Sequence, residues 1–211
     1  MLADLAVAEL GRTPLFSRAE LAYALSMNPR PADSALMLRY RDGDVAAFEE
    51  LYGRHKDSVY RYLLRLSQDP ATAEDVFQEV WSNIIKARDN YRRTAKFTTF
   101  LYRVAHNCFI DQVRRNKRHA GNVGLEPDQL ADAGESPEAL TEKTLARRRM
   151  EAALADLPEE QRDTFLLHEE AGLNLEQIAA VTGTNREASK SRLRYAVAKL
   201  RAAIDEPGDK Q

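Results

Sequence analysis

Two stretches with helical apolar spacing, separated by a glycine, constrain the last quarter of this chain. Residues 175–182 place Leu175, Ile178, Ala179 and Val181 on one helical face, and Gly183 follows where a positive φ costs nothing. The stretch 186–205 then repeats apolar residues at intervals of three and four: Leu193, Ala196, Val197, Leu200 and Ile204. Two helices joined by a glycine turn predict a helix-turn-helix.

The second of these helices is basic. Glu187 is its only acid before Asp205, and Lys or Arg side chains surround the apolar stripe: Arg186, Lys190, Arg192, Arg194, Lys199 and Arg201. A basic second helix favours insertion into a DNA major groove. The alternative is a helical hairpin whose polar face happens to be basic, because charge on a helix face commonly serves only solvation.

Charge is segregated along the rest of the chain. The formal net charge is only −2 at pH 7, which argues against a uniformly basic coat. Residues 86–119 are nevertheless strongly basic, whereas residues 120–142 contain acids and no Lys or Arg. Two basic segments separated by an acidic connector indicate contacts at two separate sites.

Apolar spacing predicts helices almost throughout. We expect a helix that begins at Asp33 or Ser34 and ends before residues 42–44, and further helices over about 45–67, 71–86, 98–117 and 159–171. Strand alternation is absent, so the fold class is all-α. The expected organisation is an extension over 1–31, a helical domain over 32–119, a flexible acidic linker over 120–142, a helix-turn-helix domain over 143–205 and a tail over 206–211.

Several function classes are excluded by composition. Cys108 is the only cysteine, which leaves no disulfide framework or cysteine metal site within one chain, and the histidines lack ligand spacing. No apolar run approaches the ~20 residues of a membrane span, and the N-terminus lacks the pattern of a secretory signal. We therefore expect a cytoplasmic protein without membrane insertion, metal or cofactor. Without a glycine-rich phosphate loop or a nucleophile–histidine pairing, we expect no enzymatic activity.

Residues 1–26 leave two alternatives open. Acids and arginines interrupt their Ala and Leu residues, and Asn28–Pro31 breaks any helix that reaches them. Either these residues form a loosely attached helix, or translation begins at Met27.

The expected helix over 98–117 combines aromatic residues, Asn107 and a basic end. Aromatic rings can stack on unpaired bases, and an Asn amide offers a paired donor and acceptor to a base edge. The polar, basic loop 91–96 precedes this helix and could hold a base flipped from a melting duplex. The alternative is that the aromatic residues are core, which we expect for Phe100 and Leu101.

The preceding helix carries an acidic face. Glu74, Asp75, Gln78 and Glu79 recur at helical spacing. One interpretation is a solvated face, and the other is a docking surface for a basic protein.

These motifs together resemble the extracytoplasmic-function sigma factors, the small promoter-specificity subunits of bacterial RNA polymerase within the sigma-70 family. The resemblance rests on Asp75-x-x-Gln78-Glu79, on the series from Phe97 to Arg114-Arg115, and on Leu157-Pro158 followed by the helix-turn-helix. It covers about 32–204 and implies a region 2-like and a region 4-like domain. It also implies binding to core RNA polymerase through the β′ clamp and β subunits, binding to promoter DNA and transcription initiation, and it leaves room for an anti-sigma factor as a partner.

The resemblance implies a role for each matching residue. Polymerase docking falls on Glu74, Asp75, Gln78 and Glu79. Recognition and melting of the −10 element fall on Arg92, Arg93, Lys96, Asn107, Arg114, Arg115, Lys117 and Arg118. Recognition of the −35 element falls on Arg186, Glu187, Lys190, Ser191, Arg192, Arg194 and Tyr195.

This chain departs from the family pattern within its recognition helix. The family commonly has Gly-Thr-Val where this chain has Glu187-Ala188-Ser189, and Tyr195 stands where an Arg is common. We therefore expect an atypical −35 preference. A one-component transcriptional regulator is the nearest rival, because it would also need a helix-turn-helix, but it would explain neither the acidic helix nor the aromatic–Asn–basic helix.

Overall fold

The computed structural model describes residues 30–120 and 142–205. All regular elements in these ranges are helices, which confirms the all-α expectation. The expected N-terminal extension and acidic linker lie almost entirely outside the described residues. Within the described ranges, no helix is long and apolar enough to cross a membrane, and no group of His, Cys, Asp and Glu side chains is arranged to hold a metal ion.

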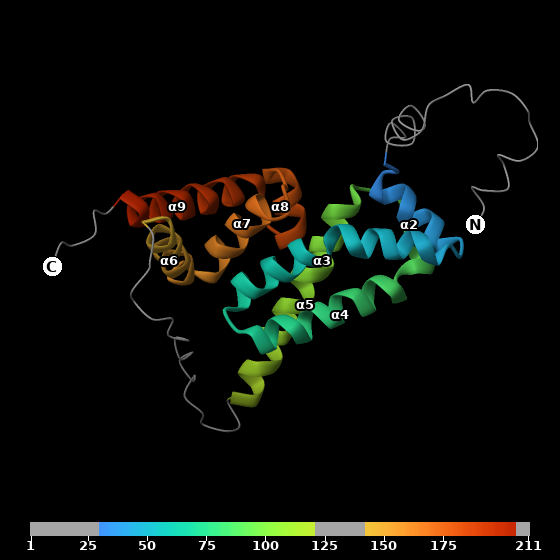
Figure 1. Cartoon of the computed structure of the whole chain (residues 1–211), viewed down its shortest axis with the longest axis horizontal. Coiled ribbons are helices and arrows are strands. Elements are labelled where there is room, and N and C mark those ends of the chain that lie inside the picture. The colour runs from blue at the N-terminus through green and yellow to red at the C-terminus, as the bar shows by residue number, and fades with distance from the viewer. Residues whose placement is uncertain (1–29, 121–141, 206–211) are drawn as a thin grey trace, which may run out of the picture. The chain divides into compact units, whose positions relative to one another are not determined.

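The first group of helices follows the expected boundaries closely. It comprises α2 (Asp33–Arg41), α3 (Val45–Ser67), α4 (Pro70–Lys86), the short 3₁₀ turn η1 (Arg88–Asn90) and α5 (Phe97–Ala120) (Figure 1). Asp44 caps α3, and Asp69 caps α4 ahead of a proline in its first turn. Helix α4 packs against both α3 and α5, and α2 covers part of α3.

The core of this group differs in part from the sequence expectation. Leu51, Tyr62, Leu63 and Leu101 are fully buried. Ile85 has the helical spacing of a core residue, one turn after the buried Trp81, yet it is 46% exposed. It is the last residue but one of α4, which ends at Lys86.

The second group forms the expected helix-turn-helix. It comprises α6 (Glu142–Ala155), α7 (Glu159–Glu169), α8 (Leu175–Thr182) and α9 (Arg186–Asp205). The Asn174 side chain and the Gln177 side chain cap the start of α8 reciprocally, and Gly183 ends it with a φ of 67°. The buried stripe of α9 is narrower than expected, because Ala196 and Leu200 are buried whereas Val197 is 37% exposed.

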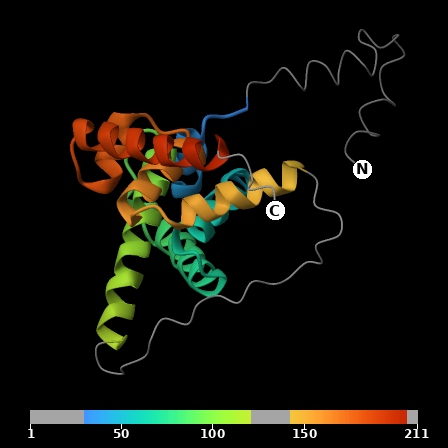
Figure 2. The same cartoon turned by 90° about the vertical axis from the view of Figure 1, so that its left-hand side faces the viewer.

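The two groups of helices pack against each other. Residues Asp33–Gln211 form one compact unit, within which α7 contacts α3 and α8 contacts α5. Figure 2 shows the C-terminal turns of α5 extending past the neighbouring helices. The expected organisation of two domains on a tether does not foresee these contacts.

Candidate nucleic-acid interface

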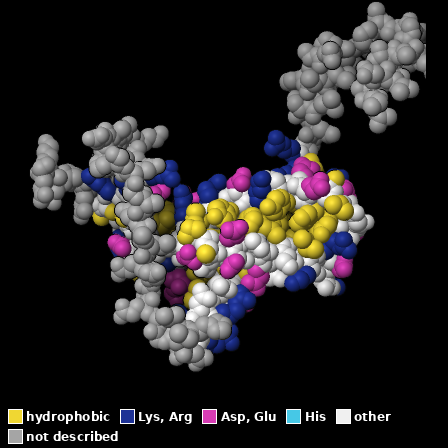
Figure 3. All heavy atoms as spheres, turned by 60° about the horizontal axis from the view of Figure 1, so that its bottom comes forward, with side chains coloured by type: hydrophobic (Ala, Val, Ile, Leu, Met, Phe, Trp, Pro, Cys, Tyr) yellow, Lys and Arg dark blue, Asp and Glu magenta, His cyan; other side chains and the backbone are white. Residues whose placement is uncertain are grey.

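The acidic face of α4 is open to solvent. Glu74, Asp75 and Gln78 are exposed, and within residues 30–120 and 142–205 neither Asp75 nor Gln78 has a side-chain hydrogen-bond or ion-pair partner. Apolar side chains run across the surface seen in Figure 3, and acidic side chains lie beside them. Ile85 follows Gln78 by two helical turns and so shares its face of α4. Sequence reasoning missed Ile85 because an isoleucine in a helical apolar pattern is read as core.

Glu79 differs from the other acids of α4. Its Oε2 atom accepts a hydrogen bond from Arg115 Nη2 of α5 at 2.6 Å, and both side chains are partly exposed. This hydrogen bond raises the pKa of the Arg115 guanidinium. A residue implied in polymerase docking and one implied in −10 binding are therefore partners of each other.

The loop before α5 divides into an exposed basic part and a buried aromatic part. Arg92, Arg93 and Lys96 are exposed. Tyr91 is buried, and its ring lies 5.4 Å from Phe100 and 6.4 Å from Phe97 between centroids. The expectation that the whole loop 91–96 could hold a base is therefore wrong for Tyr91, because its ring already fills the core. Phe97 is likewise core, with 2% exposure.

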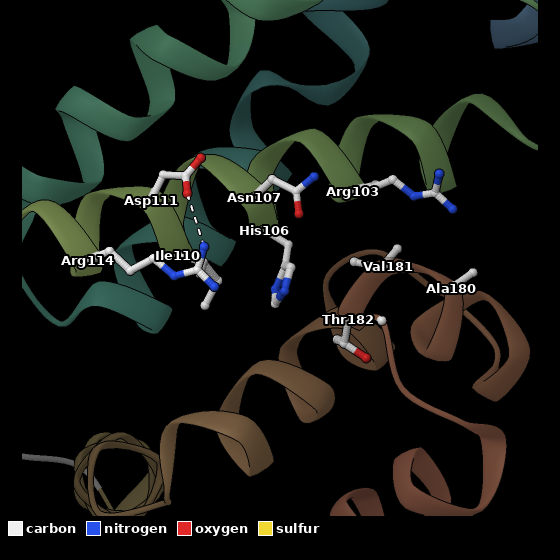
Figure 4. A pocket seen from close by; sticks show the side chains of 10 residues that line it. Arg103, His106, Asn107, Ile110, Asp111, Arg114, Ala180, Val181 and Thr182 are labelled. Atoms are coloured by element: carbon white, nitrogen blue, oxygen red, sulfur yellow. Dashed lines mark ion pairs between the residues drawn. The ribbon is translucent and has the colours of Figure 1, made fainter.

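Asn107 is exposed on one wall of a cleft of about 500 Å³ (Figure 4). Helix α5 forms that wall with Arg103, His106 and Arg114, whereas α8 and its turn form the other wall. Arg114 lies 3.6 Å from Asp111, and both side chains are largely exposed. The amide of Asn107 thus lies between exposed arginines of the same helix, an arrangement that suits a base edge flanked by phosphates.

The end of α5 continues this basic surface. Lys117 and Arg118 are exposed, and Arg118 donates to the carbonyl of Arg114 one turn earlier. Like charges spaced along one projecting helix favour contact with a phosphate backbone rather than with a single base.

The residues of α9 implied in −35 recognition differ in exposure and in whether another side chain already pairs with them. Lys190, Ser191, Arg194 and Tyr195 are exposed, and the Arg194 guanidinium lies over the Tyr195 ring at 5.1 Å. Arg192 instead pairs with Glu160 of α7 and is partly buried.

Arg186, at the start of α9, is also partnered. It pairs with Glu176 of α8 at 2.6 Å and with Glu187 at 3.2 Å. The spacing of charges along α9 could not show these pairings, because their partners lie in other helices or at its first turn.

Both halves of the described chain match known protein families. Residues 51–119 match sigma-70 region 2, and residues 147–200 match sigma-70 region 4. The chain is 31% identical over 170 residues to the RNA polymerase sigma factor CarQ of Myxococcus xanthus, covering 81% of this chain and 96% of CarQ. It is 34% identical over 166 residues to the ECF RNA polymerase sigma factor SigL of Mycobacterium tuberculosis, covering 78% of this chain and 93% of SigL.

Solved structures agree on the fold. The sigma factor RpoE in complex with the anti-sigma factor NepR from Bartonella quintana matches with a TM-score of 0.63 and 21% identity, covering 74% of this chain and 96% of RpoE. CnrH in complex with the cytosolic domain of CnrY matches with a TM-score of 0.60 and 23% identity, covering 83% of this chain and 98% of CnrH. The helix-turn-helix, the acidic α4 and the basic α5 therefore occur in a chain that belongs to the extracytoplasmic-function sigma factors of the sigma-70 family, which direct RNA polymerase to promoters and initiate transcription.

Proposed function

We propose that three exposed faces divide the work of this sigma factor. The α4 face docks core polymerase, the α5 face binds the −10 element, and α9 binds the −35 element. The observation that carries this assignment is that the acidic face and both basic faces are exposed although they lie on separate helices. We propose that the protein acts by binding in the cytoplasm, and that it catalyses no reaction itself.

The docking face centres on Asp75, Gln78 and Ile85. The carboxylate of Asp75 offers hydrogen-bond acceptors to a basic partner, and the amide of Gln78 offers both a donor and an acceptor. The exposed side chain of Ile85 adds apolar area. Glu74 extends the acidic surface. Glu79 contributes less, because Arg115 already occupies one of its oxygens.

The −10 face combines one reading residue with several positioning residues. Asn107 reads a base through its amide, whereas Arg92, Arg93, Lys96, Arg114, Lys117 and Arg118 contact phosphates. Arg115 joins them when its bond to Glu79 opens. Tyr91 and Phe97 are buried, so neither ring is proposed to stack on a base.

The −35 face consists of the exposed N-terminal half of α9. Lys190, Ser191, Arg194 and Tyr195 enter the groove, and Glu187 stands at its edge. Arg186 and Arg192 mainly brace α9 against α8 and α7 through their carboxylate partners.

An anti-sigma factor is a further proposed partner. The structures of RpoE and CnrH contain NepR and the cytosolic domain of CnrY, respectively. We propose that this chain is also controlled by a protein of that class.

The dependence of promoter binding and transcription on core polymerase tests this assignment. We expect the purified chain to bind a promoter duplex weakly alone and strongly with core polymerase, and to support run-off transcription from the same promoter. The matched control is Glu49→Gln, which removes an exposed acid of α3 outside the proposed faces. Strong, specific duplex binding without polymerase, together with no transcription on adding it, would contradict the proposal.

A further inference from the structure

Three hydroxyl groups lie side by side at the turn between α8 and α9. Oγ1 of Thr182, which is labelled in Figure 4, lies 3.0 Å from Thr184 Oγ1, and that atom lies 3.3 Å from Ser189 Oγ. Ser189 is only 1% exposed, and Thr182 and Thr184 are partly buried. These three side chains, the hydroxyl chain, connect the end of α8 with the first turn of α9.

Both ends of the hydroxyl chain donate to backbone carbonyls. Thr182 Oγ1 donates to the carbonyl of Ile178 at 3.0 Å, and Ser189 Oγ donates to the carbonyl of Asn185 at 3.2 Å. Each hydroxyl has one proton to donate. The two carbonyls therefore use the protons of the two outer hydroxyls, and only the Thr184 proton is left for the contacts between hydroxyls.

Three protons thus serve four contacts within the hydroxyl chain. The Thr184 hydroxyl can donate to Thr182 or to Ser189 but not to both at once. Replacing any one of the three hydroxyls would leave two protons for two contacts. The hydroxyl chain therefore adds little net stability, because the loss of one hydroxyl leaves every remaining contact with a proton.

The hydroxyl chain constrains the geometry of the helix-turn-helix instead. A hydrogen bond requires both a distance and an angle, whereas apolar contact is non-directional. A second polar link between α8 and α9 is the ion pair of Glu176 with Arg186, whose side chains are 63% and 53% exposed and which therefore contributes little. The buried hydroxyl of Ser189 limits rotation of α9 about its axis more narrowly than this ion pair does.

Ser189 lies directly before residues that are proposed to enter the −35 groove. Lys190 and Ser191 follow it in α9, and both are exposed. A helix in the major groove reads bases only when its side chains are held within about 0.5 Å and 10–20° of the required positions. Rotation of α9 about its axis would move all of its groove-facing side chains together.

We propose that Ser189 and Thr184 are positioning residues for −35 recognition, whose hydroxyls fix the rotation of α9 and so determine which bases its exposed side chains reach. This inference rests on the proposed −35 face and adds to it two residues that act through others. Ser189 stands where the family commonly has Val, whose side chain could not join a hydroxyl chain. The hydroxyl chain therefore alters −35 preference from inside the fold, separately from the exposed Glu187 and Tyr195.

Variants that remove or keep a hydroxyl test this role. Ser189→Ala and Thr184→Val each remove one hydroxyl, and Thr184→Val keeps the volume of a partly buried side chain, so it should fold. Thr184→Ser keeps the hydroxyl and loses only a methyl group. The matched control is Thr164→Val in α7, which removes a buried hydroxyl that donates to the carbonyl of Glu160 at 2.8 Å.

Transcription from a randomised −35 library, with core polymerase and the full-length chain, measures the effect. We expect Ser189→Ala and Thr184→Val to change the ranking of −35 sequences. The ratio of transcription between the best sequence and its single-base variants should fall about fivefold or more, as for the loss of one good contact with a base edge. Thr184→Ser and Thr164→Val should keep the wild-type ranking, because a merely structural role would lower transcription from all promoters alike.

Urea denaturation provides a second measurement that does not depend on DNA. Thr182→Val and Ser189→Ala should each shift the urea midpoint little, because each leaves a proton for every remaining contact. The double variant leaves the Thr184 hydroxyl with neither of these partners, so its shift should exceed the sum of the two single shifts. Additive shifts would show that the three hydroxyls do not act together, and would overturn the proposal.

An unchanged ranking of −35 sequences in folded Thr184→Val would also overturn the positioning role, and so would an equal change in the Thr164→Val control. Circular dichroism shows which variants fold. The proposed −35 face is tested separately by Lys190→Ala in the same library. Unchanged transcription from every −35 sequence in that variant would contradict the face itself, whereas the urea measurements would still test the hydroxyl chain.

Discussion

Arg115 of α5 donates a hydrogen bond from Nη2 to Oε2 of Glu79 on α4 across 2.6 Å. The pair links the face proposed to dock polymerase with the face proposed to bind −10 phosphates. Glu79 therefore has a partner before polymerase arrives, whereas Asp75 and Gln78 have none within residues 30–120 and 142–205. We therefore expect loss of the Asp75 and Gln78 side chains to weaken polymerase binding more than loss of the Glu79 carboxylate.

The double variant Asp75→Ala, Gln78→Ala should abolish core polymerase binding and run-off transcription. Both side chains are exposed and free to meet a partner, so their loss removes contacts to polymerase without disturbing the fold. Glu79→Gln should weaken binding less. Pull-down with core polymerase measures the difference, and Glu49→Gln serves as the control. Wild-type binding by the double variant would rule out the α4 assignment.

Asn107→Ala should relax preference at one −10 position and slow open-complex formation. Loss of a good side-chain pairing with a base edge costs about 1–3 kcal/mol of discrimination. Lys117→Ala, on the same helix, should instead weaken all −10 sequences alike and reduce the salt dependence of binding. Transcription from promoters with single −10 substitutions distinguishes the two. Uniform weakening by Asn107→Ala would indicate a structural role for this residue.

Asp69→Ala should lower the free energy of unfolding by about 0.5–2 kcal/mol at pH 7, because Asp69 caps the start of α4. Hydrogen bonds from the Thr72 side chain and backbone hold the pKa of Asp69 below its ordinary value of 3.8. A lowered folded-state pKa means that the stabilisation is present above that ordinary value and is lost as pH falls through the folded-state pKa.

Urea denaturation at pH 7 and near pH 2 checks this prediction. The difference in free energy of unfolding between wild type and Asp69→Ala should be smaller at the lower pH. Asp69→Asn is the matched control, since it keeps a capping oxygen but cannot ionise there. An equal loss of stability at both pH values would show that the carboxylate charge has no part in the cap.

The helices could be predicted well from the sequence. Val45–Ser67 was expected at its observed bounds, and the helix-turn-helix follows from two local signals, apolar spacing and Gly183. Such signals act within one or two turns of helix, so the sequence shows them directly.

Contacts between distant helices could not be predicted in this way. Asp163 stands in a polar stretch of α7, yet it is buried and accepts a hydrogen bond from Tyr62, 101 residues earlier. Tyr91 read as an exposed loop residue and is core, whereas Ile85 read as core and is exposed. Each outcome depends on which other helix lies alongside, and a single sequence does not encode that arrangement in local spacing.

The last prediction concerns the atypical residues of α9. Glu187→Gly and Tyr195→Arg should each change which −35 sequences are used. A carboxylate repels phosphate but can accept a hydrogen bond from a cytosine amino group, so its loss removes one preference. Tyr195 is 56% exposed and carries the Arg194 guanidinium on its ring, so its replacement by Arg also frees Arg194 to adopt another position.

Lys190→Ala is the comparison for these variants. Lys190 carries an exposed ammonium that is proposed to contact phosphates. Its removal should weaken binding to most −35 sequences alike and flatten the dependence of binding on salt. Transcription from a randomised −35 library, with core polymerase and each variant in turn, separates a changed preference from a general loss. If Glu187→Gly and Tyr195→Arg left the ranking of −35 sequences unchanged, neither residue would contact bases, and specificity would have to come from Ser191 and Arg194.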